Sequence, residues 1–474
     1  MATRTFFGQH IRKPFLVLLV VEACTLFGSL YSASYFRFQS DLSTFFFGFD
    51  SLWISAAIIA LVTPISMLAT GLYQVRTREG LSGVLIRIVV SFLVSGLFLT
   101  ITYYSFSSII TGQGAIIPDR EVIALAYLQS FFVIGAIRVV FFQLIDSEKF
   151  KKRVLVYGAG KTASHIDSRL RRKSDRRGFE IVGYVPVEHQ QKKVDDSKLI
   201  RLNTSLLEYS RKFNIDEIVI AINDSSRNIS VHELVNCKLN GIETIDILSF
   251  FEREAGQIRV DFLDPAWLVI SEGFHHSKFQ NALKRCVDIL ASLVILLIAS
   301  PLMLLTAVAI WLEDGIRAPI LYRQTRVGKQ GELFTVYKFR SMHTDAEKGG
   351  AVWASKTDSR ITRVGSFIRK TRIDEFPQML NVLNGTMSIV GPRPERPEFI
   401  PDLAANIPYY HERHIVKPGV TGWAQVLYPY GSSINDSYQK QLFDMYYVKN
   451  HSLFLDVLIM LQTVEVVLFG KGAR

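Results

Sequence analysis

The chain has 474 residues, enough for about two to four domains, and 49% of them are hydrophobic although 20% are charged. This combination predicts membrane segments that alternate with soluble parts, and the formal net charge of +11 favours a negatively charged partner such as nucleic acid, anionic lipid or a phosphorylated substrate. The cysteines stand far apart without metal-ligand spacing, which argues against a disulfide framework and a zinc site: Cys24, Cys237 and Cys286.

Four apolar stretches fill the first third of the chain, and each reaches the roughly 20 residues that a helix needs to cross a bilayer. They span residues 15–35, 52–73, 84–106 and 122–144. Basic residues gather before the first stretch, between the second and third, and after the fourth. By the positive-inside rule, both ends of this predicted four-helix transmembrane bundle, residues 1–147, face the cytoplasm. The first stretch is too long for a signal peptide and lacks a small-residue cleavage site.

A Rossmann-like α/β module is predicted next, over residues 148–276. Short β-rich segments alternate there with helical patterns, which is typical of a parallel sheet: 154–158, 179–185, 215–222 and 241–247. The first segment leads into Gly158-Ala-Gly160-Lys-Thr-Ala163, a turn that could hold a pyrophosphate at a helix N-terminus. A tight strand-to-helix turn needs glycine anyway, and no clear ribose-binding acid follows the second segment. A dinucleotide site and a structural or regulatory module both remain open.

The fifth apolar stretch, residues 289–312, carries Ser300-Pro301 at its centre and basic residues on both flanks. Proline removes one hydrogen bond of the helix ladder, and the Ser300 hydroxyl can bond the carbonyl that is freed. We therefore predict a re-entrant membrane helix hairpin, about residues 284–313, that enters one leaflet and returns to the cytoplasm. A kinked full span is the alternative. The last apolar stretch, 453–469, has three polar interruptions and indicates a packed or interfacial helix.

The segment between these stretches joins many cations to one acidic pair, Asp374-Glu375. Asp374 is predicted to be a helix N-cap, with Pro377 in the first turn. An apolar face is expected to anchor this helix: Phe376, Met379, Leu380 and Leu383. A carboxylate held there can attack phosphorus and form an acyl phosphate, and Mg²⁺ bound at Asp374 would screen the repulsion between the anions. The alternative is structural, because acids favour the first turn of any helix.

Several motifs in the last 195 or so residues resemble, in order, the bacterial sugar transferase family, the monotopic polyprenyl-phosphate phosphoglycosyl transferases. They are Ser300-Pro301, KFRSM, IDEFPQMLNVLNG, MSIVGPRP, KPGVTGWAQV and DMYYVKN. The resemblance implies a mostly helical, monotopic catalytic domain over residues 277–474. It also implies transfer of hexose-1-phosphate from a UDP-sugar to undecaprenyl phosphate, with release of UMP, at the cytoplasmic face of the bacterial inner membrane. The substrates and the lipid bilayer are then the expected partners, with a possible homodimer and no nucleic acid.

The resemblance also implies roles for individual residues. Asp374 would be the nucleophile and Glu375 its partner. Six further positions are implied for substrate binding: Lys338, Arg340, Arg369, Pro392, Arg393 and Pro394. Ser300 and Pro301 are implied to form the break of the hairpin. The chain departs from the family pattern at Gly385-Thr386-Met387, where Gly-Asp-Met is usual, and after WAQV, where the small members carry an Asn-Gly-Arg turn.

Two other functions remain open at this point. A membrane-tethered, NAD-dependent sugar-nucleotide modifying enzyme would use the Gly158 turn, but the α/β module lacks a Tyr-x-x-x-Lys pair. A non-catalytic scaffold for polysaccharide assembly would not require the acidic pair. For the transferase, analogy with large family members favours glucose or galactose as the sugar, in the first step of exopolysaccharide, capsule or O-antigen synthesis.

Overall fold

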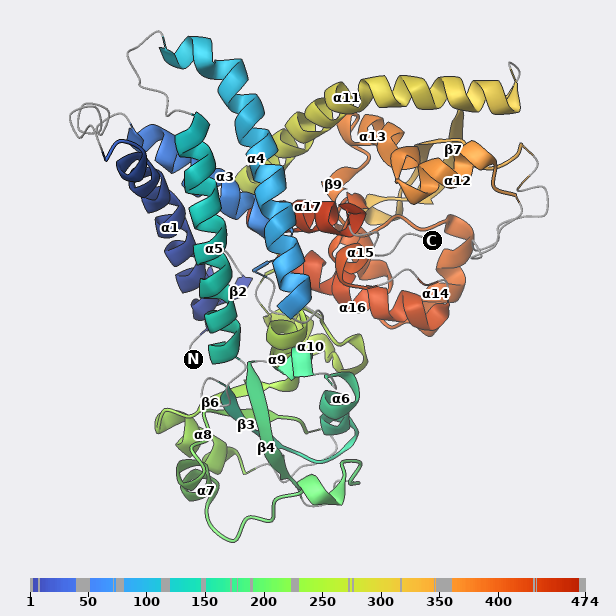
Figure 1. Cartoon of the computed structure of the whole chain (residues 1–474). Helices are drawn as coiled ribbons and strands as arrows, with labels where there is room; N and C mark the ends of the chain where they lie inside the picture. Colours follow the sequence, from blue (N-terminus) through green and yellow to red (C-terminus); the bar gives the residue numbers. More distant parts are fainter. Residues whose placement is uncertain are drawn as a thin grey trace. The chain divides into compact units, whose positions relative to one another are not determined.

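The computed structural model describes most of the chain in a set of separate ranges. These are residues 3–6, 9–39, 52–70, 72–73, 81–111, 120–145, 151–170, 173–176, 178–187, 191–222, 230–271, 273–274, 277–315, 318–344, 346, 360–428, 431 and 433–468. Apart from a few residues at the N-terminus, they divide into two compact units, one that ends at Phe250 and one that begins at Phe251 (Figure 1). Each unit is described by itself.

Apolar helices make up the first half of the first unit, after the short strands β1 (Thr3–Phe6) and β2 (Gln9–Arg12). They are α1 (Lys13–Arg37), α3 (Leu52–Ala69), α4 (Leu81–Thr111) and α5 (Arg120–Ile145). Each contains a segment long and apolar enough to cross a membrane, as predicted. The helices share one core, in which the buried Arg138 guanidinium of α5 pairs with Glu22 of α1 at 2.6 Å. A buried charge of this kind needs a partner, so the pair ties the two helices together.

The second half of the first unit is a four-stranded parallel sheet, as the sequence predicts. Its strands are β3 (Lys152–Tyr157), β4 (Phe179–Val185), β5 (Glu217–Ile220) and β6 (Glu243–Asp246), in the order β4-β3-β5-β6. Helices α6 (Lys161–Arg169), α7 (Leu206–Lys212) and α8 (Val231–Leu239) lie between them in the chain. Gly158 has φ +127°, and a Cβ there would lie 2.2 Å from the Ala221 carbonyl oxygen. Close approach of two strand ends therefore requires this glycine, whether or not a nucleotide binds.

The second unit is mostly helical. It begins within α9 (Ile247–Ala255) and continues with α10 (Pro265–Ile270), α11 (Lys278–Asp314), β7 (Leu321–Val327), β8 (Leu333–Phe339), α12 (Arg363–Lys370), α13 (Met379–Leu383), β9 (Ser388–Val390), α14 (Ile400–Asn406), β10 (Gly419–Thr421), α15 (Trp423–Leu427), α16 (Ile434–Asn450) and α17 (Leu453–Leu468). Strands β7 and β8 form an antiparallel hairpin, and β9 pairs with β10 in parallel.

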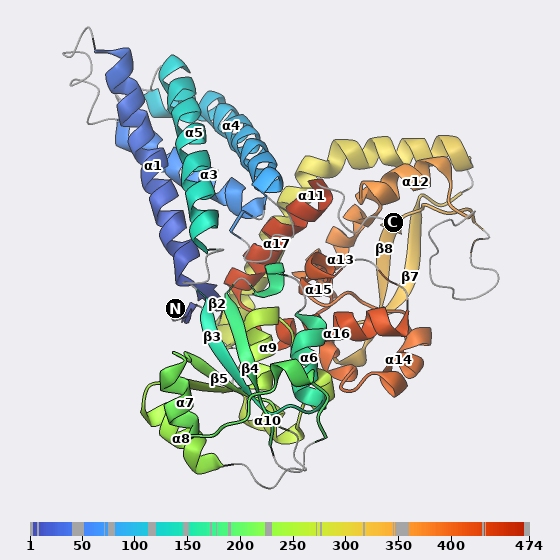
Figure 2. The same cartoon turned by 60° about the horizontal axis from the view of Figure 1, so that its bottom comes forward.

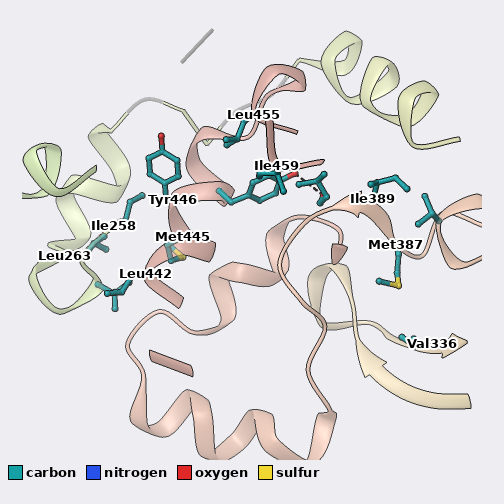
Figure 3. Packing of buried hydrophobic residues seen from close by; sticks show 14 of the residues in the cluster. Ile258, Leu263, Val336, Met387, Ile389, Leu442, Met445, Tyr446, Leu455 and Ile459 are labelled. Carbon is teal, nitrogen blue, oxygen red and sulfur yellow. Dashed lines mark hydrogen bonds between the residues drawn. The ribbon is translucent and has the colours of Figure 1, made fainter. Parts of the chain in front are cut away.

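The core of this unit gathers around α16, whose side chains are buried along most of its length (Figure 3). Leu442 and Met445 of α16 meet Leu455 and Ile459 of α17, so the last apolar helix is packed, as predicted. Ile258 packs in the same core, and its backbone N–H donates to the Leu442 carbonyl at 3.0 Å. The structure therefore packs part of the segment 251–276, which the sequence interpretation assigned to the α/β module, with the second unit.

Helix α11 contains the fifth apolar stretch. It is one continuous helix of 37 residues with Pro301 inside, and it bends along its length in both views (Figure 2). The Ser300 hydroxyl donates to the Leu297 carbonyl at 2.8 Å, which is the carbonyl that Pro301 leaves without its N–H partner. This hydrogen bond agrees with the sequence prediction. Large apolar side chains are exposed along the helix: Leu290, Leu293, Val294, Leu297, Ile298, Leu304, Leu305 and Leu312.

Candidate active site

The acidic pair lies in a short 3₁₀ helix, Ile373–Gln378, that leads directly into α13. The predicted N-cap is wrong: Arg372 occupies that position, and Asp374 follows inside the first turn without capping any backbone N–H. Arg372 has φ +61°, a left-handed conformation that costs energy for a residue with a side chain. The strained residue turns the chain sharply after α12, immediately before the two carboxylates.

The apolar residues that anchor this segment differ partly from the prediction. Met379 is buried as expected, but Leu380 is 44% exposed, and Val382 is fully buried in its place. The change from a 3₁₀ to an α-helix at Met379 alters the angular spacing of the side chains, so an α-helical pattern extended back to Phe376 misjudges the buried face. Asn381 adds a polar anchor, because its side chain accepts from the Tyr337 N–H and donates to the Thr335 carbonyl of β8.

Glu375 is surrounded by cations from three separate parts of the chain. Its Oε1 atom accepts a hydrogen bond of 2.8 Å from Arg393 Nη2 and one of 3.3 Å from Lys338 Nζ, and it lies 3.7 Å from Arg372 Nη1. Burial alone would raise the pKa of Glu375, but the charges of Arg393 and Lys338 outweigh burial and hold the pKa well below its usual range. Glu375 is therefore ionised, and it holds these three cations together.

Asp374 has the opposite environment. Its side chain is 7% exposed, and its Oδ1 atom is buried without a hydrogen-bond partner among the described residues. Burial and the neighbouring negative charge of Glu375 raise the pKa of Asp374 to about 6, against the opposing charges of Lys338 and Arg393. A buried carboxylate with an unpaired oxygen is costly to maintain, and strongly perturbed acids of this kind are concentrated at functional sites.

Lys338 and Arg340, from the KFRSM motif, stand at the end of β8. Burial lowers the pKa of Lys338, and the charge of Glu375 opposes this effect. Arg340 is held through its backbone N–H, which donates to the Ile320 carbonyl at 2.9 Å. Its Nη1 atom is buried and has no hydrogen-bond partner among the described residues. Lys338 is thus engaged by the acidic pair, whereas the Arg340 guanidinium keeps a donor without a partner among the described residues.

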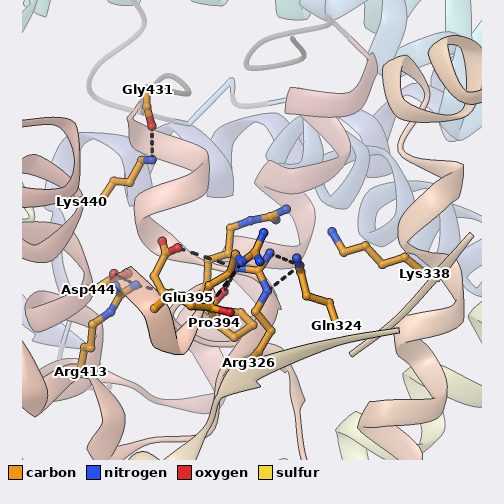
Figure 4. A network of polar contacts seen from close by, with 12 residues as sticks. Gln324, Arg326, Lys338, Pro394, Glu395, Arg413, Gly431, Lys440 and Asp444 are labelled. Carbon is orange, nitrogen blue, oxygen red and sulfur yellow. Dashed lines mark hydrogen bonds and ion pairs between the residues drawn. The ribbon is translucent and has the colours of Figure 1, made fainter. Parts of the chain in front are cut away.

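The Pro392-Arg393-Pro394 turn follows β9 and brings its arginine to Glu375. Backbone contacts fix the turn: the Pro392 carbonyl accepts from the Gly419 N–H at 2.9 Å, the Arg393 carbonyl from Arg413 at 3.0 Å, and the Pro394 carbonyl from Arg326 at 3.1 Å. Figure 4 shows Arg326 and Arg413 near Pro394. Every carbonyl of the turn is therefore engaged, which leaves the Arg393 side chain aimed at the acidic pair.

A cavity that is open to solvent lies beside this turn, and its space free of protein atoms, including the solvent at its mouth, is about 580 Å³. It is lined mainly by charged and polar side chains: Arg372, Arg393, Glu395, Arg413, Ala424, Gln425, Tyr428, Lys440, Asp444 and Val466. Buried Arg413 pairs with Asp444 at 2.7 Å, and burial raises the pKa of Asp444 to about 6 against the charge of Arg413. Gln425 Nε2 is buried without a hydrogen-bond partner in the described part of the chain. The excess of cations over acids suits a phosphorylated ligand.

Sequence reasoning found the acidic pair, Lys338 and Arg393, which the structure brings together, but it missed most of the cavity. Arg413, Gln425 and Lys440 lie far along the chain from the pair, and only the positions of Gln425 and Asp444 within quoted motifs gave a signal. Arg369 lies in the last turn of α12, where its carbonyl accepts from the Arg372 N–H, and its side chain makes no hydrogen bond or ion pair within the described ranges. Its predicted phosphate contact stays a prediction. Ser300 and Pro301 lie within α11 and contribute no side chain to the cavity.

A metal ion would find few protein ligands here. The described residues contain no group of three or more His, Cys, Asp or Glu side chains that could hold one. The unpaired Oδ1 atom of Asp374 is an available carboxylate oxygen, and Mg²⁺ commonly binds through one or two carboxylates together with substrate phosphates and water. The residues present therefore fit Mg²⁺ that arrives with a phosphorylated substrate.

Comparison with known proteins identifies the family to which the last part of the chain is similar. Residues 279–470 match the family described as bacterial sugar transferase. The chain is 44% identical over 241 residues to the UDP-N-acetylgalactosamine-undecaprenyl-phosphate N-acetylgalactosaminephosphotransferase of Aeromonas hydrophila, which covers 51% of this chain and 56% of that protein. It is 52% identical over 132 residues to a putative undecaprenyl-phosphate N-acetylgalactosaminyl 1-phosphate transferase of Bacillus subtilis. This alignment covers 28% of this chain and 73% of that protein.

A third relative is similar over a longer part of the chain than residues 279–470. The UDP-glucose:undecaprenyl-phosphate glucose-1-phosphate transferase of Escherichia coli is 32% identical over 330 residues, which is 68% of this chain and 69% of that protein. The chain spans little more than half of the length of the Aeromonas relative. The match to the family over residues 279–470 contains the acidic pair, its cations and the cavity. The chain belongs to the bacterial sugar transferase family.

Proposed function

We propose that this membrane protein transfers hexose-1-phosphate from a UDP-sugar to undecaprenyl phosphate and releases UMP, through a covalent intermediate on Asp374. The observation that carries the proposal is the contrast within the acidic pair. Glu375 is fully engaged by Arg393, Lys338 and Arg372, whereas Asp374 Oδ1 is buried and unpaired beside the same cations. One acid organises positive charge, and its neighbour remains available to react.

In the first step, the Asp374 carboxylate attacks the sugar-bearing phosphorus of the UDP-sugar. A phosphorus–oxygen bond forms to Asp374, and the bond to the uridylate phosphate breaks, so UMP leaves with that electron pair. Arg393, Lys338 and Arg372 stand where charge builds up on the phosphate oxygens, and preorganised cations in a site that excludes water stabilise such charge strongly. The cavity next to Arg393 gives the nucleotide room, with Gln425 Nε2 as an unused donor.

In the second step, a phosphate oxygen of undecaprenyl phosphate attacks the phosphorus of the acyl phosphate. The new diphosphate linkage forms, the bond to Asp374 breaks, and the carboxylate is regenerated. Splitting the transfer in two lets a soluble donor and a lipid acceptor use one nucleophile in turn. Mg²⁺ bound to Asp374 and the substrate phosphates would offset the repulsion between the anions during both steps.

The orientation follows from the location of the two substrates. UDP-sugars are soluble and the acceptor is a lipid, so the site would lie at a membrane surface; the basic residues that flank the apolar helices favour the cytoplasmic side of the inner membrane. We infer that α11 enters one leaflet, turns at Ser300-Pro301 and returns, because basic residues flank it on both sides and the freed Leu297 carbonyl is satisfied within the helix. A helix that crossed the bilayer completely would separate Lys284 from the acidic pair.

The relatives differ in the sugar for which they are named. The sequence favoured glucose or galactose, but the Aeromonas relative is named for N-acetylgalactosamine and the Escherichia coli relative for glucose. The preference for glucose or galactose therefore stays a prediction. We also propose that the reaction initiates the synthesis of an exopolysaccharide, capsule or O-antigen; the dimer is likewise a proposal.

The test is release of UMP by the purified full chain. The protein is reconstituted with undecaprenyl phosphate and Mg²⁺ and supplied in turn with UDP-glucose, UDP-galactose and their N-acetylated forms. We expect UMP release with one or more of these donors, and none above background for the Asp374→Asn variant. Normal turnover by Asp374→Asn would remove the proposed nucleophile, and no release with any donor from folded wild type would overturn the proposed function.

A further inference from the structure

Two cations converge on an open position beside the loop that follows α13. A Cβ atom placed on Gly385 would lie 3.6 Å from Arg285 Nη2 and 3.6 Å from Lys417 Nζ, and its third-nearest neighbour is Arg285 Cζ at 3.8 Å. These atoms come from α11 and from the segment before β10, so the position is enclosed by charge from distant parts of the chain. The Arg285 guanidinium and the Lys417 ammonium therefore approach the same side of Gly385.

The positive charge at this position is balanced only in part among the described residues, by the charge of Asp288. Within the described ranges, Arg285, Lys417 and the nearby Lys329 form no ion pair; Arg285 instead donates to the Val382 and Leu383 carbonyls at 2.5 and 2.7 Å. Burial lowers the pKa of Lys417, and the charge of Arg285 and then that of Lys329 act in the same direction. A cation that is partly buried among other cations gains most from an anionic ligand.

The two charged neighbours of this group are already engaged. The negative charge of Asp288 raises the pKa of Lys417, against the effect of the neighbouring cations. Asp288 accepts hydrogen bonds of 3.0 Å from the Ser388 hydroxyl and from the Ile389 N–H. Lys284 pairs with Asp456 at 2.6 Å. Asp288 offsets part of the charge of Arg285, Lys417 and Lys329, and an external anion can neutralise the rest.

The position of these cations in the chain indicates which anion they meet. Arg285 lies in the second turn of α11, and Leu290, which is 63% exposed, follows it by five residues. At 1.5 Å per residue, Arg285 lies about 8 Å along the axis from Leu290, the first of the closely spaced exposed apolar side chains of α11 that continue to Leu312. Basic residues at this distance from a membrane segment meet the phosphates of anionic lipids.

We propose that Arg285, Lys417 and Lys329 bind the headgroup phosphate of an anionic glycerophospholipid at the cytoplasmic surface of the membrane. The headgroup would lie beside Gly385 and fix the height of α11 relative to the bilayer. This site is separate from the acidic pair: it uses none of the side chains that line the cavity beside Arg393.

The experiment uses the full chain in a non-ionic detergent and monomeric, short-chain lipids. Dihexanoylphosphatidylglycerol is titrated by calorimetry, with dihexanoylphosphatidylcholine and inorganic phosphate as the other two arms. We expect saturable binding of the phosphatidylglycerol only. Equal binding of the phosphatidylcholine would show that the acyl chains, rather than the charge, are recognised. Equal binding of inorganic phosphate would assign the site to a free anion. Either result overturns the proposal.

Variants then locate the site. Lys417→Gln should weaken phosphatidylglycerol binding about fivefold, as expected for loss of one interfacial cation, and Lys417→Arg should restore it. Lys238→Gln removes an equivalent exposed charge from α8 and should change nothing. Thr386→Asp adds a carboxylate next to Gly385 without removing a cation and should weaken binding about tenfold, whereas Thr386→Asn should not.

The same variants distinguish this lipid from the acceptor substrate. If Lys417→Gln raises the KM for undecaprenyl phosphate but leaves phosphatidylglycerol binding unchanged, the site belongs to the acceptor and the proposal is wrong. Unchanged phosphatidylglycerol binding in both Lys417→Gln and Thr386→Asp, with folding verified by their thermal transitions, would overturn it as well.

Discussion

Arg393 Nη2 lies 2.8 Å from Glu375 Oε1, so a turn 18 residues downstream is joined to the acidic pair by a charged hydrogen bond. The same oxygen also accepts from Lys338, and Asp374 keeps Oδ1 unpaired. This division between the two acids leads to testable consequences for pH dependence, for stability and for chemistry.

The first prediction concerns the acid limb of the pH profile. Asp374 must be ionised to attack, and burial with the charge of Glu375 raises its pKa to about 6. UMP release under single-turnover conditions should therefore increase as the pH rises through about 6 and level off above pH 7. A rate that is constant between pH 5 and 7, in protein shown to stay folded, would contradict the assignment of Asp374.

The second prediction concerns Glu375. Glu375→Gln keeps an oxygen that can accept from Arg393 but removes the negative charge that raises the pKa of Asp374. We expect the rate to fall roughly 100-fold because the cations are no longer held together, and the acid limb to move to lower pH. Glu398→Gln, which neutralises an exposed carboxylate of the same unit, is the control. A slower enzyme with an unmoved acid limb would show that Glu375 does not act on Asp374.

The third prediction links function to stability. The pKa of Asp374 is higher in the folded state than its ordinary value of 3.8, so the protonated form favours folding, and this contribution is lost as the pH rises from about 4 through about 6. Asp374→Asn should therefore stabilise the protein at pH 7.5, by at most about 3 kcal/mol, and have little effect near pH 4. Thermal unfolding in detergent at both pH values tests this.

Asp196→Asn serves as the comparison for this measurement, because it removes an exposed carboxylate of the other unit. It should leave the unfolding temperature nearly unchanged at both pH values. A lower unfolding temperature for Asp374→Asn at pH 7.5 would mean that the ionised carboxylate makes stabilising contacts, contrary to its unpaired oxygen.

The fourth prediction concerns the path of α11. In a cysteine-free background, Lys278→Cys marks the segment before the helix and Glu398→Cys marks the segment after it. A membrane-impermeant maleimide added to intact spheroplasts should label neither, and it should label both once the membrane is permeabilised. Labelling of only one of them in intact spheroplasts would establish that α11 crosses the bilayer, and the re-entrant path would be wrong.

The sequence predicted the elements whose signals are local. Apolar length identified the four N-terminal helices and α11, and alternating β-rich segments identified β3 to β6. Because Pro301 has no backbone N–H, the sequence also predicted that the Ser300 hydroxyl would bond the carbonyl freed in the preceding turn, which is that of Leu297. The N-cap assignment of Asp374 failed because Arg372 adopts a left-handed conformation and starts a 3₁₀ helix, which single-sequence propensity does not anticipate.

The cavity lay beyond sequence reasoning for a different reason. Arg413 and Lys440 become neighbours of Arg393 only through packing of α16 and the turn after β9, and long-range packing leaves no local pattern. In the sequence, Arg413 and Lys440 cannot be distinguished from charged residues that are exposed to solvent. The acidic pair could be identified from the sequence because it lies in a recognisable motif. Only the interatomic distances show that the cations contact Glu375 and leave Asp374 Oδ1 unpaired.

The most direct test of the central claim is to look for the phosphosugar on Asp374. The full chain is incubated with the UDP-sugar that supports UMP release, without undecaprenyl phosphate, quenched, digested and examined by mass spectrometry. The account predicts a hexose-phosphate adduct on the peptide that contains Asp374, absent from Asp374→Asn and discharged by added undecaprenyl phosphate. An active enzyme that releases UMP only when the acceptor is present, and never carries this adduct, would contradict it.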